Sequence, residues 1–70
     1  MPEVSEGESV TVTIDEQDLT GEVETVRDNG HSLAYSLTID GTSCKMYADT
    51  RCVELIVDNK SHFVTDIATE

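Results

Sequence analysis

Alternating apolar and polar residues dominate the chain from its tenth residue onward and predict a mostly β domain. Segment 10–14 alternates valine and isoleucine with threonine, the two-residue period of a strand with one buried face. The alternation resumes over 19–24 and then slips by one residue at Val26. A slip of this kind predicts a β-bulge near Glu24-Thr25.

Turn residues divide the rest of the alternating sequence into short strands. Asn29-Gly30 predicts a tight hairpin turn in which both central residues have positive φ, and Asp40-Gly41 is a second signal of the same kind. A further turn is expected at Asp49-Thr50. Together these signals predict strands at 10–14, 19–26, 33–39, 43–48 and 52–57.

The chain is long enough for one domain, and its two ends differ from the middle. Residues 1–9 are polar and acidic and are expected to form a flexible tail. Residues 10–60 form the predicted β domain. The C-terminal segment, 61–70, has apolar residues four apart, such as Phe63 and Ile67, which favours a short helix; a short extra strand is the alternative.

The predicted fold class is all-β. Five short strands can bury a core only if their sheet curls strongly on itself, and a bulge after Gly21 would help the curl. We therefore expect a small five-stranded bent antiparallel sheet or a partly open barrel of the SH3 or Sm kind.

A strong excess of acidic residues modifies this picture. Fifteen Asp and Glu residues oppose four Lys and Arg, which gives a net charge of -11 on 70 residues. Such a chain repels itself at ordinary ionic strength and suits molar salt, so a halophilic source is expected. Intrinsic disorder, polyanion mimicry and an ordinary acidic mesophile are the alternatives. Four scattered cations argue against duplex DNA as a partner.

Localisation is predicted from two missing signals. No basic region precedes an apolar run near residue 1, as a secretory signal would require. No apolar stretch approaches the roughly 20 residues of a membrane span. The sequence therefore predicts a cytoplasmic protein with no membrane partner.

Part of the chain resembles the Sm-like family of small bent β-barrels. The resemblance lies in Val10-x-Val12-x-Ile14 followed by Leu19-x-Gly21-x-Val23-x-x-Val26, which is similar to the first Sm motif. It implies a bent barrel, ring assembly and RNA binding. The base-contacting residues of the family do not carry over, because Arg27 and His31 stand at the positions of its Asp and Asn. The Arg-Gly pair of the second motif has no counterpart, since Cys52 follows Arg51.

The two cysteines are the main candidates for metal or redox chemistry. Cys44 and Cys52 are separated by seven residues, unlike the close pairs of zinc knuckles. If Ala48 lies at the centre of their hairpin, the two thiols face each other across two strands. They would then be buried free thiols, a disulfide or, with His31 and His62, half of a metal site. Neither a metal nor a cofactor is predicted.

A non-enzymatic protein-interaction module is the predicted function. No nucleophile has an evident base and orienting group, so no catalytic residue is assigned. The candidate binding patch is Lys45, Tyr47 and Arg51, where an aromatic ring is flanked by cations. A sheet edge or this strand face would bind an unidentified protein partner, or a second copy in a homo-oligomer. The alternatives are an Sm-like RNA-binding module and a small metal-binding or redox domain using Cys44 and Cys52.

Overall fold

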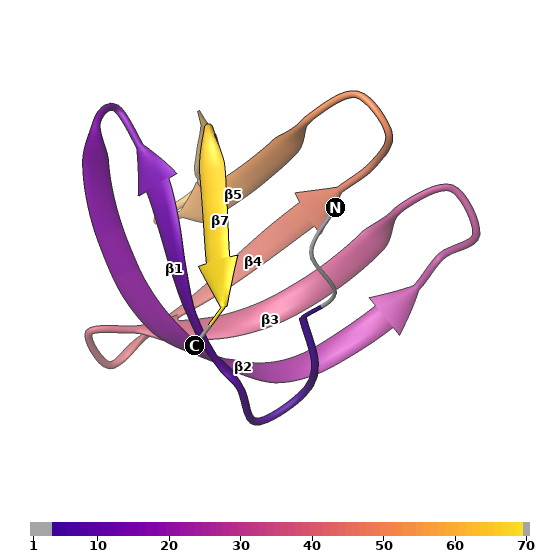
Figure 1. The fold of residues 1–70 in the computed structure, drawn as a ribbon, viewed down its shortest axis with the longest axis horizontal. Helices are drawn as coiled ribbons and strands as arrows, with labels where there is room; N and C mark the ends of the chain where they lie inside the picture. The colour runs from indigo at the N-terminus through magenta and orange to yellow at the C-terminus, as the bar shows by residue number, and fades with distance from the viewer. Residues whose placement is uncertain (1–3, 70) are drawn as a thin grey trace.

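Seven antiparallel strands form one sheet that curls into a half-barrel, seen in a computed structural model that describes residues 4–69 (Figure 1). The order across the sheet is β6-β5-β4-β3-β2-β1-β7, so every strand lies beside its sequence neighbour except β7, which pairs with β1. The strands are β1 Ser9–Ile14, β2 Gln17–Asp28, β3 Leu33–Ile39, β4 Thr42–Ala48, β5 Val53–Val57, β6 Lys60–Phe63 and β7 Asp66–Thr69.

The all-β prediction is confirmed, but the prediction of five strands and a C-terminal helix is wrong. The segment expected to be a helix or one extra strand forms β6 and β7. The Val64 N–H donates to the Val53 carbonyl at 2.8 Å, and the Thr65 N–H donates to the Thr13 carbonyl at 2.8 Å. Between these two hydrogen bonds the chain crosses from edge strand β6, beside β5, to edge strand β7, beside β1. Ile67 packs against the core whereas Phe63 is 69% exposed, so their four-residue spacing does not mark a shared face.

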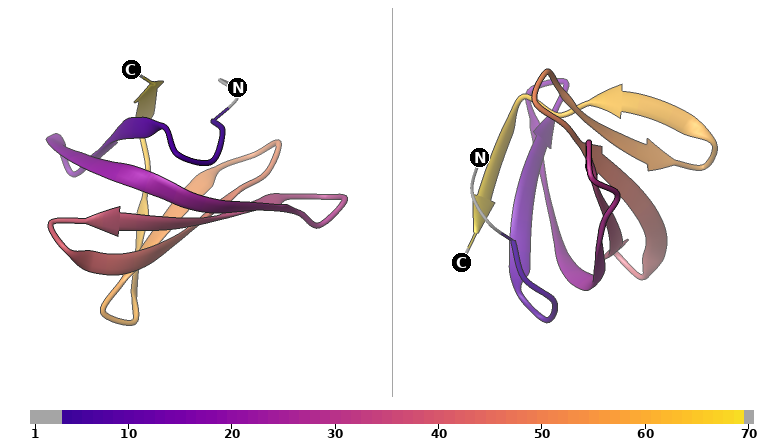
Figure 2. Two further views of the ribbon diagram at one scale, coloured as in Figure 1. Left: turned by 90° about the horizontal axis from the view of Figure 1, so that it is seen from below. Right: turned by 90° about the vertical axis from the view of Figure 1, so that its right-hand side faces the viewer.

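Strand β2 bends at the point where the sequence predicted a bulge. Its register with β3 shifts between Val23 and Thr25, which confirms the predicted irregularity. Just before it, Gly21 lies between Val10 of β1 and Ile39 of β3. A Cβ atom at this glycine would lie 2.6 Å from the Thr38 carbonyl oxygen, so the strands approach more closely than any larger residue would permit. The close approach and the bulge together produce the curl visible in Figure 2.

Residues 4–8 pack against the bulge, although a flexible tail was predicted over 1–9. Val4 is buried at 7% exposure and belongs to the core. The Val23 N–H donates to the Glu8 carbonyl at 2.9 Å, and the Gly7 N–H donates to the Val23 carbonyl at 2.8 Å. These contacts pair the Val23 N–H and C=O, which point away from β3 and lie just beyond the end of the β1–β2 ladder at Ser9. The first three residues of the predicted tail lie outside the described residues.

The hairpin turns follow the sequence signals with one exception. Asp40-Gly41 is a two-residue turn with positive φ at both positions, as predicted. The prediction for Asn29-Gly30 is wrong, because only Gly30 has positive φ and the loop is four residues long. The Asn29 N–H donates to the Ser32 carbonyl at 2.9 Å, and the Asp28 carboxylate accepts the Gly30 N–H at 2.8 Å. This side-chain contact stabilises a wider loop than a two-residue turn.

The core fills the concave side of the sheet, and acidic residues surround it. Leu37, Met46 and Leu55 are its largest fully buried side chains. No polar or charged residue is buried among residues 4–69. The acidic residues in this range are therefore exposed or half-buried, as expected for a solvation coat on a β domain.

Candidate functional face

The outer face of the sheet carries a cation-bearing row of side chains that crosses five strands. Residues directly opposite in neighbouring strands share a face, with Cβ atoms about 4.5–5.5 Å apart. The register places one such row in the order Arg27, Ala34, Tyr47, Glu54 and Phe63. The next row runs through Thr25, Ser36, Lys45, Ile56 and Ser61. Two of the four cations and two of the three aromatic residues therefore meet on one face.

Arg27, Lys45 and Tyr47 surround a shallow hollow on this face. Its volume is about 290 Å³, near the lower limit of ligand pockets, and β2, β3 and β4 each supply part of its lining. Tyr47 is 42% exposed, so a large part of the phenol ring is free for contact. The Lys45 ammonium donates to the Ser36 hydroxyl at 2.7 Å, which holds its charge over the hollow. No hydrogen bond or ion pair ties the Arg27 guanidinium to another of the described residues.

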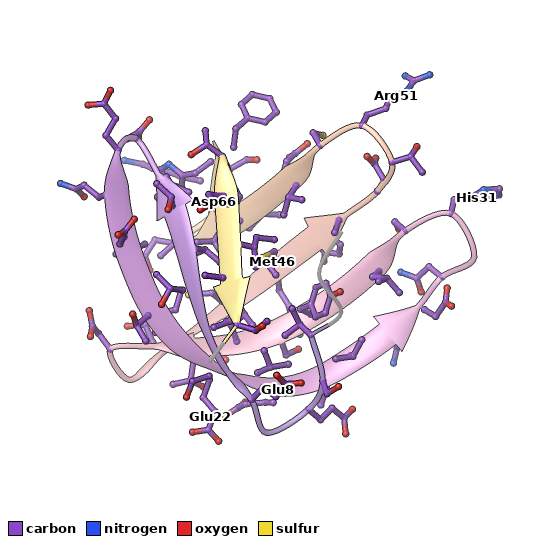
Figure 3. The ribbon with its side chains drawn as sticks, in the orientation of Figure 1. Glu8, Glu22, His31, Met46, Arg51 and Asp66 are labelled. Carbon is purple, nitrogen blue, oxygen red and sulfur yellow. The ribbon has the colours of Figure 1, made fainter. Side chains whose placement is uncertain are left out.

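The structure brings together two of the three residues of the predicted patch and separates the third. Lys45 and Tyr47 both line the hollow, whereas Arg51 does not. Figure 3 shows Arg51 on the loop between β4 and β5, directed away from the sheet. That loop is held by Asp49, whose carboxylate accepts the Arg51 N–H at 2.7 Å and the Cys52 N–H at 2.9 Å. These two hydrogen bonds also lower the pKa of Asp49.

Arg27 belongs to the face but was missed by sequence reasoning. Its place beside Ala34 and Tyr47 depends on the register of three strands and on the bulge that precedes it. The bulge was predictable from the slipped alternation, and it could have placed Arg27 outward. Its place in the same row as Tyr47 depends on the pairing of β2 and β4 with β3, which the pattern within β2 alone does not predict.

Two carboxylates, those of Glu24 and Glu54, accept hydrogen bonds from hydroxyls on the same face. The Ser61 hydroxyl donates to Glu54 at 2.7 Å, and the Thr38 hydroxyl donates to Glu24 at 2.8 Å. Each hydrogen bond stabilises a carboxylate in place. The face is therefore mixed in charge: Arg27 and Glu24 both lie on β2, Lys45 lies on β4 and Glu54 lies on β5.

The two cysteines do not face each other. Both thiols are free, and Cys44 pairs with Leu37 of β3. The ladder between β4 and β5 runs from Lys45 to Ala48, so Cys52 lies beyond one end and Cys44 beyond the other. Ala48 is the last residue of β4, not the centre of a tight hairpin, which is why the expected opposition is wrong. Burial raises the pKa of the Cys44 thiol, and the nearby Asp58 carboxylate raises it further.

The histidines lie apart from the cysteines and from the hollow. Figure 3 shows His31 at the tip of the loop between β2 and β3. His62 is in β6, opposite Leu55. Within residues 4–69 no three His, Cys, Asp or Glu side chains come close enough together to hold a metal ion. The same residues contain no helix long and apolar enough to span a membrane.

Comparison with known proteins leaves the geometry as the only guide to function. No protein-family model, no curated protein and no solved structure matches the chain.

Proposed function

We propose that the chain is a non-enzymatic protein-interaction module whose outer face, over β2, β3 and β4, binds an acidic segment of a protein partner. The observation that carries the proposal is the convergence of Arg27, Lys45 and Tyr47 on one hollow. A carboxylate of the partner would meet the two cations, and an apolar or aromatic side chain would contact the Tyr47 ring. The proposal includes a partly open barrel of SH3 or Sm type, in the cytoplasm of a salt-accumulating organism.

The distribution of charge supports a specific surface. The chain carries -11 overall, so an acidic partner is repelled from most of its surface. Strands β3 and β4 contain no acidic residue, and they form the centre of the face. An acidic segment would therefore be repelled least over β3 and β4, beside Arg27 and Lys45, which gives orientation as well as affinity.

Binding of a labelled acidic peptide containing tyrosine tests the proposal by fluorescence anisotropy. We expect Arg27→Gln and Tyr47→Ser each to weaken binding by about fivefold or more, which corresponds to about 1 kcal/mol. Arg51→Gln is the matched control, because it removes the same charge outside the hollow. Equal loss in Arg27→Gln and Arg51→Gln would show that only net charge matters and would overturn the proposal.

Single-stranded RNA is the competing ligand class, because an exposed ring beside cations also suits base stacking. Oligouridylate is therefore titrated in parallel over the same range of KCl. If oligouridylate binds through Tyr47 and the acidic peptide does not bind, the protein-interaction proposal is wrong.

A further inference from the structure

Strand β6 has an edge whose polar groups point away from the rest of the sheet. The turn before it, Asp58-Asn59, has positive φ at both residues, as in a tight two-residue hairpin. In such a hairpin the flanking residues, Val57 and Lys60, exchange backbone hydrogen bonds. Every second residue of β6 then bonds to β5 in the same way, so the next such residue is His62. The Val64 N–H, which donates to β5, has the same phase. The N–H and C=O groups of Ser61 and Phe63 therefore point outward.

An open slot of about 650 Å³ runs along this edge. One wall consists of Ser61, His62 and Phe63, and the turn between β1 and β2 contributes Asp15 and Glu16. Since alternate residues of a strand point to opposite faces, lining by three consecutive residues shows that the slot follows the edge itself. Figure 2 shows the hairpin of β5 and β6 projecting from the barrel, with β6 as its outer strand.

The slot combines an apolar contact with negative charge. Phe63 is 69% exposed, the most exposed large apolar residue among those described. No hydrogen bond or ion pair joins the Asp15 or Glu16 carboxylate to another described residue. Both acids also hold positive φ, where glycine or asparagine is the favoured residue. The strand beside them, β6, has no acidic residue.

We infer that this slot binds one extended, basic segment of a partner protein, which adds to the sheet as an eighth strand beside β6. Outward N–H and C=O groups of Ser61 and Phe63 would pair with its backbone. One of its apolar side chains would pack on the Phe63 ring, and a Lys or Arg side chain would meet Asp15 or Glu16. This inference concerns a second surface and does not rest on the proposed function of the outer face.

A second copy of the chain is a weaker candidate for the slot. Each copy carries -11, so two copies repel each other where a basic segment is attracted. The β6 strand of a second copy would also bring its own β5, which pairs with it throughout. A single extended segment fits a slot bounded by β6 on one side and by the turn residues on the other.

The test uses a labelled peptide of alternating lysine and valine, with a glutamate-for-lysine peptide as the charge control. Two further versions are N-methylated at alternate residues, either on the edge that faces β6 or on the opposite edge. We expect methylation of the peptide edge that faces β6 to weaken binding at least tenfold. Methylation of the opposite edge should have little effect. Equal affinity of both methylated peptides would mean simple charge attraction and would overturn the inference.

Protein variants locate the site independently of the peptide. Ser61→Pro removes an outward N–H and keeps the backbone hydrogen bonds of β6 to β5, although it also removes the hydroxyl that donates to Glu54. Glu16→Gln removes a slot charge. We expect losses of about tenfold and about threefold. Glu22→Gln is the matched charge control and should change little. Chemical shift perturbation in the wild-type protein should centre on β6, which keeps the test valid if Ser61→Pro does not fold. Shifts centred elsewhere, tight binding of the acidic control, or a dimer paired through β6 would overturn the inference.

The two proposals fail separately. Tyr47→Ser should weaken binding of the acidic peptide to the outer face by about fivefold or more and leave the lysine-valine peptide unaffected. Ser61→Pro should have the opposite pattern. Loss of both activities in one folded variant would contradict the assignment of two independent surfaces.

Discussion

Replacement of Gly21 by alanine tests the close strand packing that bends β2. The added Cβ would lie 2.6 Å from the Thr38 carbonyl oxygen and 2.7 Å from Cγ1 of Ile39. Thr38 cannot recede without disturbing the ladder between β3 and β4, in which it pairs with Ser43. Overpacking of this kind costs about 1–3 kcal/mol, and the backbone contact places this site in the upper half of that range.

The cost is large relative to the stability of so small a domain. A chain of 70 residues has an unfolding free energy of about 3.5–10 kcal/mol, at about 0.05–0.15 kcal/mol per residue. Alanine recovers about 0.5–1 kcal/mol because it is less flexible than glycine when unfolded. We therefore expect Gly21→Ala to lower the unfolding free energy by about 2 kcal/mol.

Urea unfolding followed by circular dichroism in molar KCl measures this difference. Gly41→Ala is the matched control, because Gly41 has a φ of 74° and no atom within 4 Å of an added Cβ. Its cost of about 1–2 kcal/mol comes from backbone strain alone. The two variants should differ by NMR: shifts in Gly21→Ala should spread to Thr38 and Ile39, while those in Gly41→Ala stay at the turn. A Gly21→Ala protein as stable as the wild type, with unshifted β3 resonances, would refute the close approach.

Three further measurements test other parts of the structure. The melting temperature should rise with KCl from about 0.1 M to about 3 M, since screening relieves the self-repulsion of a -11 chain; a flat profile would contradict the halophilic interpretation. Asp49 has a lowered pKa when folded, so its contribution is present above the unfolded pKa of about 3.9 and is lost as pH falls through the folded value. Asp49→Asn should therefore flatten the acid side of the stability profile, and an unchanged profile would show that the loop bonds are not formed. A thiol reagent should modify half-buried Cys52 before buried Cys44, because Cys44 needs unfolding to become accessible; equal rates would argue against burial of Cys44.

Local patterns were sufficient to predict the strands whose faces differ in polarity. The alternation at 10–14 and 33–39 marks strands with one buried face, and the slip at Val26 marks the bulge, because both features are local. The segment after Lys60 lacked such a signal. It forms two short edge strands. Phe63 is exposed and Ile67 packs on the core, so their four-residue spacing resembled a helical turn by coincidence.

Contacts between distant segments explain what the sequence could not predict. Val4 is buried where residues 7 and 8 pair with Val23 of β2, beyond the end of the β1–β2 ladder, and this contact exists only in the folded sheet. Arg27 reaches Tyr47 across β3 in the same way, and the slot beside β6 depends on the turn at Asp15-Glu16. Lys45 and Tyr47 were found because they are two residues apart in one strand. Arg51 was included by sequence proximity, but the loop takes it away from the face.

The pairing of β7 with β1 has a consequence for biosynthesis. Six residues of β1, Ser-Val-Thr-Val-Thr-Ile, carry no charge, no proline and no glycine, a composition typical of segments that assemble into cross-β aggregates. One side of β1 is paired as soon as β2 emerges from the ribosome, but the other side waits for β7, more than fifty residues later. During that interval the backbone N–H and C=O groups on one side of β1 are unpaired and can pair with another chain. Pairing with β7 then removes this exposed edge. Truncation before Asp66 would therefore be expected to promote aggregation of the chain.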